Sequence, residues 1–299
     1  CCCHHFLFPL SFGMRKKIIL LILLSVLQYP LLIAQSVIIN EFQKDPPSGG
    51  AEFIELLNNG PESVNLSGWK IGDERKLITI IDASLILKPD SFLVISDDSV
   101  GFISQFGELD FLEKRSLPAL NNGGDQIRLF DALGFRVDSI QYESEWGGKD
   151  LSLERRSPDP ELSNFAENWA DSPSAQGGTP GFPNLAQADT DPPVLLQASF
   201  LGNSAIQLSY DEVLNEKIAT EVSEYEVNAD PDLLFIQSEG NLLSLYFSRP
   251  FRDQSRIRIR IPNQSDIFGN TSEPEEVSLY YLQVSEVRPD SVIINEILF

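Results

Sequence analysis

The stretch QIRLFDALGFRVDSIQY, residues 126–142, decides the class of fold. Two apolar runs, QIRLF and FRVDSIQY, flank a turn around residues 131–134, and this arrangement predicts a β-hairpin. Similar short runs recur at intervals of about ten residues between Ser36 and Asn184, without a long stretch of helical period, which predicts an all-β sandwich or barrel.

The same pattern starts again at Val194. The run LLFIQSEGNLLSLYF, residues 233–247, predicts a second hairpin around residues 239–241, and SRIRIRIPN predicts a strand. The segment VLNEKIATEVSEYEV has room for one helical turn before a further strand. Residues 194–288 therefore have the size and the turn spacing of a small sandwich module.

The chain between these modules is rich in proline, glycine, serine and asparagine. We expect residues 157–184 to be ordered coil pinned by Trp169. Residues 186–193 end in two prolines, which favour extended geometry, and are predicted to be a linker. The first module then comprises residues 36–185.

The N-terminal part has the features of a secretory leader. Met14 is the single methionine, and a basic triplet and an interrupted apolar run follow it. This order predicts a signal peptide over residues 14–34, cleaved after Ala34, and residues 1–13 as mis-assigned sequence upstream of the start. A retained N-terminal anchor is the alternative. The run is short for a membrane span, and no span is predicted after cleavage.

All three cysteines and both histidines lie in residues 1–5. A metal cluster there is a poor alternative, because adjacent ligands fit badly around one tetrahedral ion. From Gln35 onward the chain has no cysteine, histidine or methionine, which excludes disulfides, a Ser-His-Asp triad and histidine-ligated zinc. It carries 19 basic against 44 acidic side chains, a net charge of −25, so we expect no nucleic acid as a partner.

Eight ordered blocks of the first module resemble a lamin-tail domain. They are IINEF (38–42), AEFIELLNNG (51–60), VNLSGWKIGD (64–73), LKPDSFLVIS (87–96), NNGGDQIRLFDALGFRVDSIQY (121–142), SLERR (152–156), NW (168–169) and GGTPGFPN (177–184). The resemblance implies an Ig-like β-sandwich of a kind found in exported bacterial proteins as well as in nuclear lamins.

The second module resembles a bacterial Ig-like domain of the surface-layer type. The blocks that carry this resemblance are DTDPPVLLQASF (189–200), AIQLSYDEVLNE (205–216) and DIFGNTSE (266–273). The pentapeptide VIINE at residues 37–41 returns at residues 292–296, so residues 291–299 are interpreted as the first strand of a truncated second lamin-tail domain. The predicted fold class is all-β, with two Ig-like β-sandwich modules in series.

The acids Glu41, Glu52 and Glu55 lie in or near the first strands. A pair of carboxylates can carry out glycoside hydrolysis, which makes a carboxylate-based glycosidase one hypothesis. The favoured interpretation is that these groups hydrogen-bond the backbone and neighbouring asparagines. The resemblance implies scaffolding at these positions, so we predict that the chain is not an enzyme and that it has no catalytic residues.

Four residues near the module junction are candidate calcium ligands: Asp189, Asp191, Asp266 and Asn270. Carboxylate and amide oxygens suit Ca²⁺, and a bound ion would stiffen the linker. The favoured interpretation is turn formation, because their spacing does not resemble an EF-hand loop and Asp and Asn beside Gly and Pro commonly form turns. No cofactor is expected otherwise.

Two groups of side chains are candidates for a binding surface. Alternation on one strand places Arg256, Arg258 and Arg260 on one face, where they would bind an anionic polymer or, as we favour, pair with acids on the neighbouring strand. Trp146 is the aromatic candidate for a sugar platform, together with Trp69 and Trp169, although core packing is favoured for this trio.

These patterns predict an exported, multi-modular, non-catalytic scaffold, adhesion or binding protein. Its expected location is the periplasm, the cell surface or the medium, and its expected partners are proteins or polysaccharides. The alternative is a non-catalytic accessory region of a larger secreted hydrolase, such as a nuclease or phosphatase, whose catalytic domain lies outside this chain.

Overall fold

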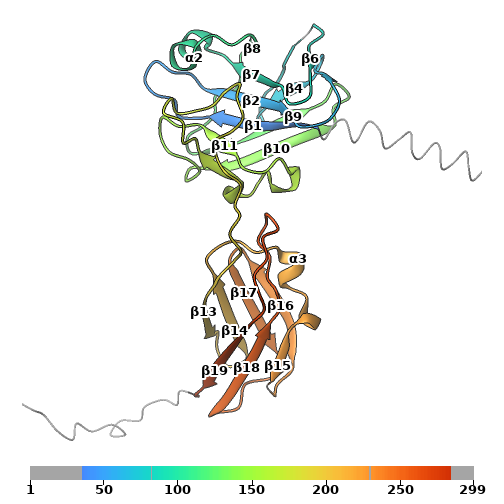
Figure 1. Cartoon of the computed structure of the whole chain (residues 1–299), viewed down its shortest axis with the longest axis vertical. Coiled ribbons are helices and arrows are strands. Elements are labelled where there is room, and N and C mark those ends of the chain that lie inside the picture. The colour runs from blue at the N-terminus through green and yellow to red at the C-terminus, as the bar shows by residue number, and fades with distance from the viewer. Residues whose placement is uncertain (1–35, 82, 229, 284–299) are drawn as a thin grey trace, which may run out of the picture. The chain divides into compact units, whose positions relative to one another are not determined.

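The structure is a computed structural model that describes residues 36–81, 83–228 and 230–283. The chain divides into two compact units between Ala188 and Asp189. Each unit consists mostly of strands in facing sheets, which confirms the predicted all-β sandwiches (Figure 1). The predicted leader and the returning VIINE strand lie outside the described residues. In the part of the chain that is described, no helix has the length and hydropathy of a membrane span.

Unit 1 is built from two large sheets and one strand pair. In spatial order the six-stranded sheet contains β12 (Trp169–Asp171), β11 (Leu153–Arg155), β1 (Val37–Gln43), β2 (Phe53–Asn58), β7 (Phe92–Ser96) and β8 (Leu112–Lys114). The other sheet contains β10 (Arg136–Glu143), β9 (Gly124–Phe130), β4 (Lys70–Gly72) and β5 (Leu77–Thr79), and β3 (Val64–Asn65) pairs with β6 (Ile86–Leu87). The β9–β10 hairpin is the one predicted from residues 126–142.

Alternation along β2 assigns its two faces. Ile54 and Leu56 enter the main core between the sheets, whereas Phe53 points to the opposite face and packs edge-on against Phe102, 5.5 Å between ring centroids. Phe102 belongs to α2 (Ser99–Phe106), a helix that the strand-and-turn prediction missed. The side chain of Asp98 caps it by accepting hydrogen bonds from the first-turn amides.

The segment predicted to be coil contributes to the sheet. Residues 157–184 include η1 (Pro160–Leu162), η2 (Ala166–Asn168) and the edge strand β12. The prediction was therefore wrong in this part, since β12 pairs with β11 and extends the six-stranded sheet. Trp169 is buried, and its indole N–H donates to the carbonyl oxygen of Ser163 at 3.0 Å.

A buried ion pair joins the two large sheets of unit 1. Arg155 on β11 donates to Asp138 on β10 at 2.7 Å, and both side chains are almost completely shielded from solvent. The same groups bind the backbone of β1: Arg155 donates to the carbonyl oxygen of Ile39 (2.8 Å), and Asp138 accepts from its amide (2.9 Å). Ser163 donates to Asp138 and accepts from Arg155.

Unit 2 contains a four-stranded and a three-stranded sheet. They comprise, in spatial order, β13 (Leu195–Phe200), β14 (Ala205–Tyr210), β17 (Leu242–Phe247) and β16 (Leu233–Glu239), and then β15 (Glu226–Asn228), β18 (Ser255–Ile261) and β19 (Glu275–Tyr281). The expected helical turn is α3 (Glu216–Ala219), followed by η3 (Val222–Glu224). The predicted hairpin at residues 239–241 joins β16 to β17.

The core of unit 2 lies between its sheets. Alternate apolar residues of β14, among them Leu208, meet alternate isoleucines of β18, among them Ile259. Both edge strands of the four-stranded sheet carry a register shift, between Leu195 and Gln197 on β13 and between Leu233 and Phe235 on β16.

Candidate functional site

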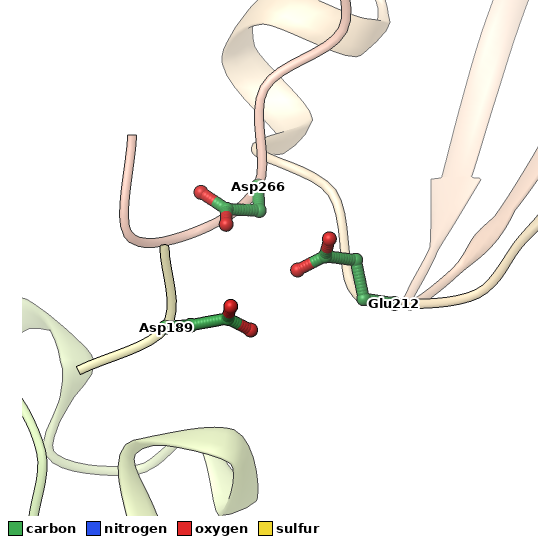
Figure 2. A group of neighbouring side chains, drawn as sticks. All are labelled: Asp189, Glu212 and Asp266. Carbon is green, nitrogen blue, oxygen red and sulfur yellow. The ribbon is translucent and has the colours of Figure 1, made fainter. Parts of the chain in front are cut away.

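Three acidic side chains from separate segments of unit 2 converge on one point. Asp189 begins the unit, Glu212 follows β14, and Asp266 lies in the loop between β18 and β19. Their carboxylate oxygens lie within 4.8 Å of one another, as Figure 2 shows. Asp266 is fully buried, and the other two are half-buried.

Backbone and amide contacts fix this group. Asn270 donates twice to Asp266, from its backbone amide (2.8 Å) and its side chain (2.7 Å), and its side chain also reaches the carbonyl oxygen of Asp189 (3.0 Å). The backbone amide of Asp191 donates to the Asp189 carboxylate at 3.0 Å. Of the four predicted calcium ligands, Asp189 and Asp266 thus contribute carboxylates to the cluster, and Asn270 holds them in place. The Asp191 carboxylate stays outside it.

Glu212 completes the cluster and was not predicted. An antiparallel bridge between Leu214 and Asp266 brings it there, so the contact depends on tertiary pairing and leaves no local sequence signal. Burial, and after it the charges of Asp266 and Asp189, together raise the pKa of Glu212 to about 7. Among the described residues no basic side chain forms an ion pair with the three carboxylates.

The donor set of this cluster fits a calcium ion. Ca²⁺ binds oxygen ligands at about 2.4 Å, so two oxygen atoms on opposite sides of the ion are separated by roughly twice that distance. The three carboxylates meet this spacing. Three negative charges without a basic partner can be stabilised by a divalent cation or by a proton on Glu212.

The arginine row lies on the outer face of the three-stranded sheet. Arg256, Arg258 and Arg260 alternate along β18 with buried isoleucines and are all exposed. Arg260 is the Cα partner of Glu226 on β15 and of Glu276 on β19. Its guanidinium lies 3.8 Å from the Glu226 carboxylate. Arg260 thus lies beside acids of the neighbouring strands, as the favoured interpretation expects.

Three glutamates of unit 1 form a row across the six-stranded sheet. Glu41 on β1 is the Cα partner of Glu55 on β2 and of Glu154 on β11. All three are fully buried. Because Glu55 alternates with the core residues Ile54 and Leu56, its side chain lies on the face of the sheet away from the main core.

A closing segment, residues 177–186, is hydrogen-bonded onto this row. Four of its backbone amides donate to the carboxylates: Thr179 to Glu41 (2.9 Å), Gly181 to Glu55, and Leu185 and Ala186 to Glu154 (2.7 and 2.6 Å). The side chains that donate are Asn40 to Glu55, Ser152 to Glu41, and Ser172 and Thr179 to Glu154. Each of the three glutamates therefore accepts hydrogen bonds from both backbone and side-chain donors of the protein.

Glu52, the third acid considered for glycoside hydrolysis, is separate from the row. Its carboxylate accepts from the backbone amide of Leu120 at 2.9 Å, and burial raises its pKa. A glycosidase needs two carboxylates on either side of a space that admits the sugar. Glu41 and Glu55 are instead enclosed and engaged with the backbone, as the scaffolding interpretation expects.

The sequence of this unit matches a known family. The family described as Lamin Tail Domain matches residues 34–144. The first unit contains a lamin tail domain. Glu41 and Glu55 of the row lie within the matched residues, and Glu154 and the closing segment follow them.

Comparison with solved structures gives bacterial surface-layer proteins. The crystal structure of the N-terminal part of the bacterial S-layer protein SbsC is 9% identical, with a TM-score of 0.29, and the match covers 30% of this chain and 24% of that one. The structure of the S-layer protein rSbsC(31-844) is also 9% identical, with a TM-score of 0.29, over 31% of this chain and 14% of the other. The chain thus spans about a quarter of the length of the first of these proteins and a smaller share of the second. No curated protein matches the chain.

Burial changes the protonation of Glu41 and Glu55 in the lamin tail domain. It raises the pKa of Glu41 to about 7, against the opposing hydrogen bonds from Ser152 and Thr179. It also raises the pKa of Glu55 well above its usual range, with the charge of Glu41 as the next cause. The two glutamates therefore bind protons at a pH well above the range in which an exposed glutamate does.

The three tryptophans of unit 1 differ in how deeply they are buried. Trp69 and Trp169 are buried in the main core, and Trp169 meets Phe42 edge-on at 5.3 Å. Trp146 is partly buried and packs against the same core. Core packing thus accounts for two of the three, and Trp146 keeps part of its ring exposed.

Proposed function

We propose that this chain is part of an exported, non-catalytic scaffold that binds proteins or polysaccharides at a bacterial cell surface. The main support is the state of the glutamate row, whose carboxylates are buried and used to hold the closing segment in place. The acids best placed for hydrolysis thus serve the fold of the lamin tail domain. The exposed arginine row of unit 2 offers a surface for contact with a partner.

Export is tested by expressing the tagged chain in a bacterium, fractionating the cells and determining the N-terminal mass. We expect the chain in the envelope or the medium, beginning at Gln35. Recovery of the intact chain with its leader from the cytoplasm would contradict the proposal.

Binding without catalysis is tested with the purified chain and isolated cell envelopes. We expect saturable co-sedimentation, and no release of sugars or phosphate from polysaccharide and phosphodiester substrates. Turnover that the change Glu55→Gln abolishes would overturn the non-catalytic assignment, because that change keeps the shape of the side chain and removes its acid group.

A second candidate function is calcium binding by unit 2. The convergence of Glu212 on Asp189 and Asp266 favours it. These three residues would hold the ion, and water would fill the remaining positions of its shell. The ion would neutralise the mutual repulsion of the three carboxylates and fix the start of the unit to its loops.

Calcium at millimolar concentration is expected to stabilise unit 2 by about 1 kcal/mol, given the affinities typical of extracellular modules. Calorimetry measures this shift, and Trp fluorescence controls for unit 1, since all three tryptophans are there. Glu212→Gln should remove the shift, whereas Glu216→Gln, an exposed neighbour, should keep it.

Because protons compete with calcium for Glu212, calcium should bind more tightly as the pH rises through about 7. An unchanged transition with calcium would refute the site.

A further inference from the structure

Basic side chains are unevenly distributed in unit 2. Residues 189–283 contain 16 acidic and only six basic side chains, yet five of the six basic ones fall within residues 249–260. Three of these five are the arginine row of β18, all on the solvent face of the sheet. The acidic unit therefore carries one localised positive surface.

Cross-strand pairing divides this row into a neutralised end and a free end. Arg260 lies between Glu226 and Glu276. Arg258 lies between Asn228 and Ser278, and no described residue forms an ion pair with Arg256 or Arg258. Within the arginine row, the positive charge that is available to a ligand therefore belongs to these two arginines.

The free end also carries an exposed aromatic ring. Tyr280 is the Cα partner of Arg256, is 57% exposed and points to the same face. A shallow depression of about 420 Å³ lies at the neutralised end, outside the pair of Arg256 and Tyr280, and is lined by Arg258, Arg260, Val227, Asn228 and the acids Glu226 and Glu276. The surface combines two guanidinium groups, a ring, an amide and a hydroxyl.

We propose that Arg256, Arg258 and Tyr280 form a binding site for a carboxylate-bearing polysaccharide. Guanidinium groups bind carboxylates through paired, charge-assisted hydrogen bonds. The exposed tyrosine ring offers an apolar face for a sugar ring and a hydroxyl that can hydrogen-bond, and Asn228 and Ser278 offer partners for sugar hydroxyls. This inference rests on the proposed surface-binding function and names its ligand class.

Other anionic partners fit this surface less well. Nucleic acid is bound through an extended basic footprint. Here two free arginines lie on a unit in which acidic side chains outnumber basic ones by ten, 16 against six. An acidic peptide would use the arginines alone and leave the tyrosine ring and the hydroxyl-binding groups without a role. The mixture of groups therefore favours an acidic sugar polymer.

The test measures binding of the full chain to polygalacturonate by calorimetry, with dextran, duplex DNA and polyglutamate as comparison ligands. We expect binding to polygalacturonate that weakens with salt, and at least about tenfold weaker binding to the other three polymers. The double change Arg256→Gln/Arg258→Gln should weaken binding to polygalacturonate by about tenfold or more, and Tyr280→Ala by about threefold or more.

Arg260→Gln is the matched control. It removes the same kind of side chain from the same strand, at a position where neighbouring acids already offset the charge. It should change the affinity by less than about twofold. An equal loss with Arg260→Gln, tighter binding of DNA or polyglutamate, or no binding of polygalacturonate would overturn the site. If envelopes still bind the double variant as tightly as the parent, this site is refuted while the proposed surface function stands.

Discussion

Replacing Arg155 with methionine is expected to destabilise unit 1 by about 3–5 kcal/mol, since it leaves a buried carboxylate without its partner. The Arg155 guanidinium joins Asp138 of one sheet to the Ile39 backbone of the other and also binds Ser163. Its removal would lower the thermal midpoint by about 10 °C for a domain of this size. Urea unfolding followed by tryptophan fluorescence reports on this unit alone.

Two further variants isolate the cause. Arg156→Met changes the neighbouring arginine, which has no ion pair with any described residue, and should cost about 1 kcal/mol or less. Combining Asp138→Leu with Arg155→Met should cost clearly less than the sum of the two single changes, because no charge is then left unpaired. A loss below about 1 kcal/mol for Arg155→Met would show that the pair does not join the sheets.

The lamin tail domain is expected to lose stability as the pH rises from about 4.5 to about 7. The folded pKa of Glu41 is raised to about 7 from a usual value of 4.5. The folded state therefore holds a proton more tightly than the unfolded state, and its advantage is complete below the lower value and lost through the upper one. The size of the effect is roughly 3 kcal/mol for such a shift.

Glu41→Gln should flatten this dependence. The amide keeps an acceptor for the donors Ser152 and Thr179 and carries no titrating proton. Glu62→Gln removes one exposed carboxyl from the same unit and so controls for the change in net charge. Tryptophan fluorescence in urea at several pH values gives the slope. A domain that gains stability over this range, or a Glu41→Gln variant with the parent slope, would contradict the assignment.

Local patterns predicted the elements that local chemistry determines. The hairpins at residues 131–134 and 239–241 were found because their glycine-containing turns and flanking apolar runs are contiguous in sequence. Strand β12 was missed, because three residues become a strand only through pairing with β11. Helix α2 was also missed, although Asp98 ahead of an apolar run was a usable capping signal.

The candidate sites were predictable to the same extent. Asp266 and Asn270 are four residues apart, so their contact could be expected from the sequence. The arrival of Glu212 depends on a bridge between distant segments. Alternation placed the three arginines on one face. Which of them is neutralised depends on the register with β15 and β19, which the sequence pattern does not specify.

The register shifts on β13 and β16 bear on how densely such chains can be crowded together. An outermost strand with a regular row of free amides and carbonyls invites another chain to align with it and begin a fibre. Register shifts at Leu195–Gln197 and Leu233–Phe235 interrupt this row of backbone groups on both edge strands of the four-stranded sheet. They shorten the length over which a strand of another chain can pair with the edge. The edges of the four-stranded sheet are therefore poor templates for polymerisation when such chains are held at high local concentration.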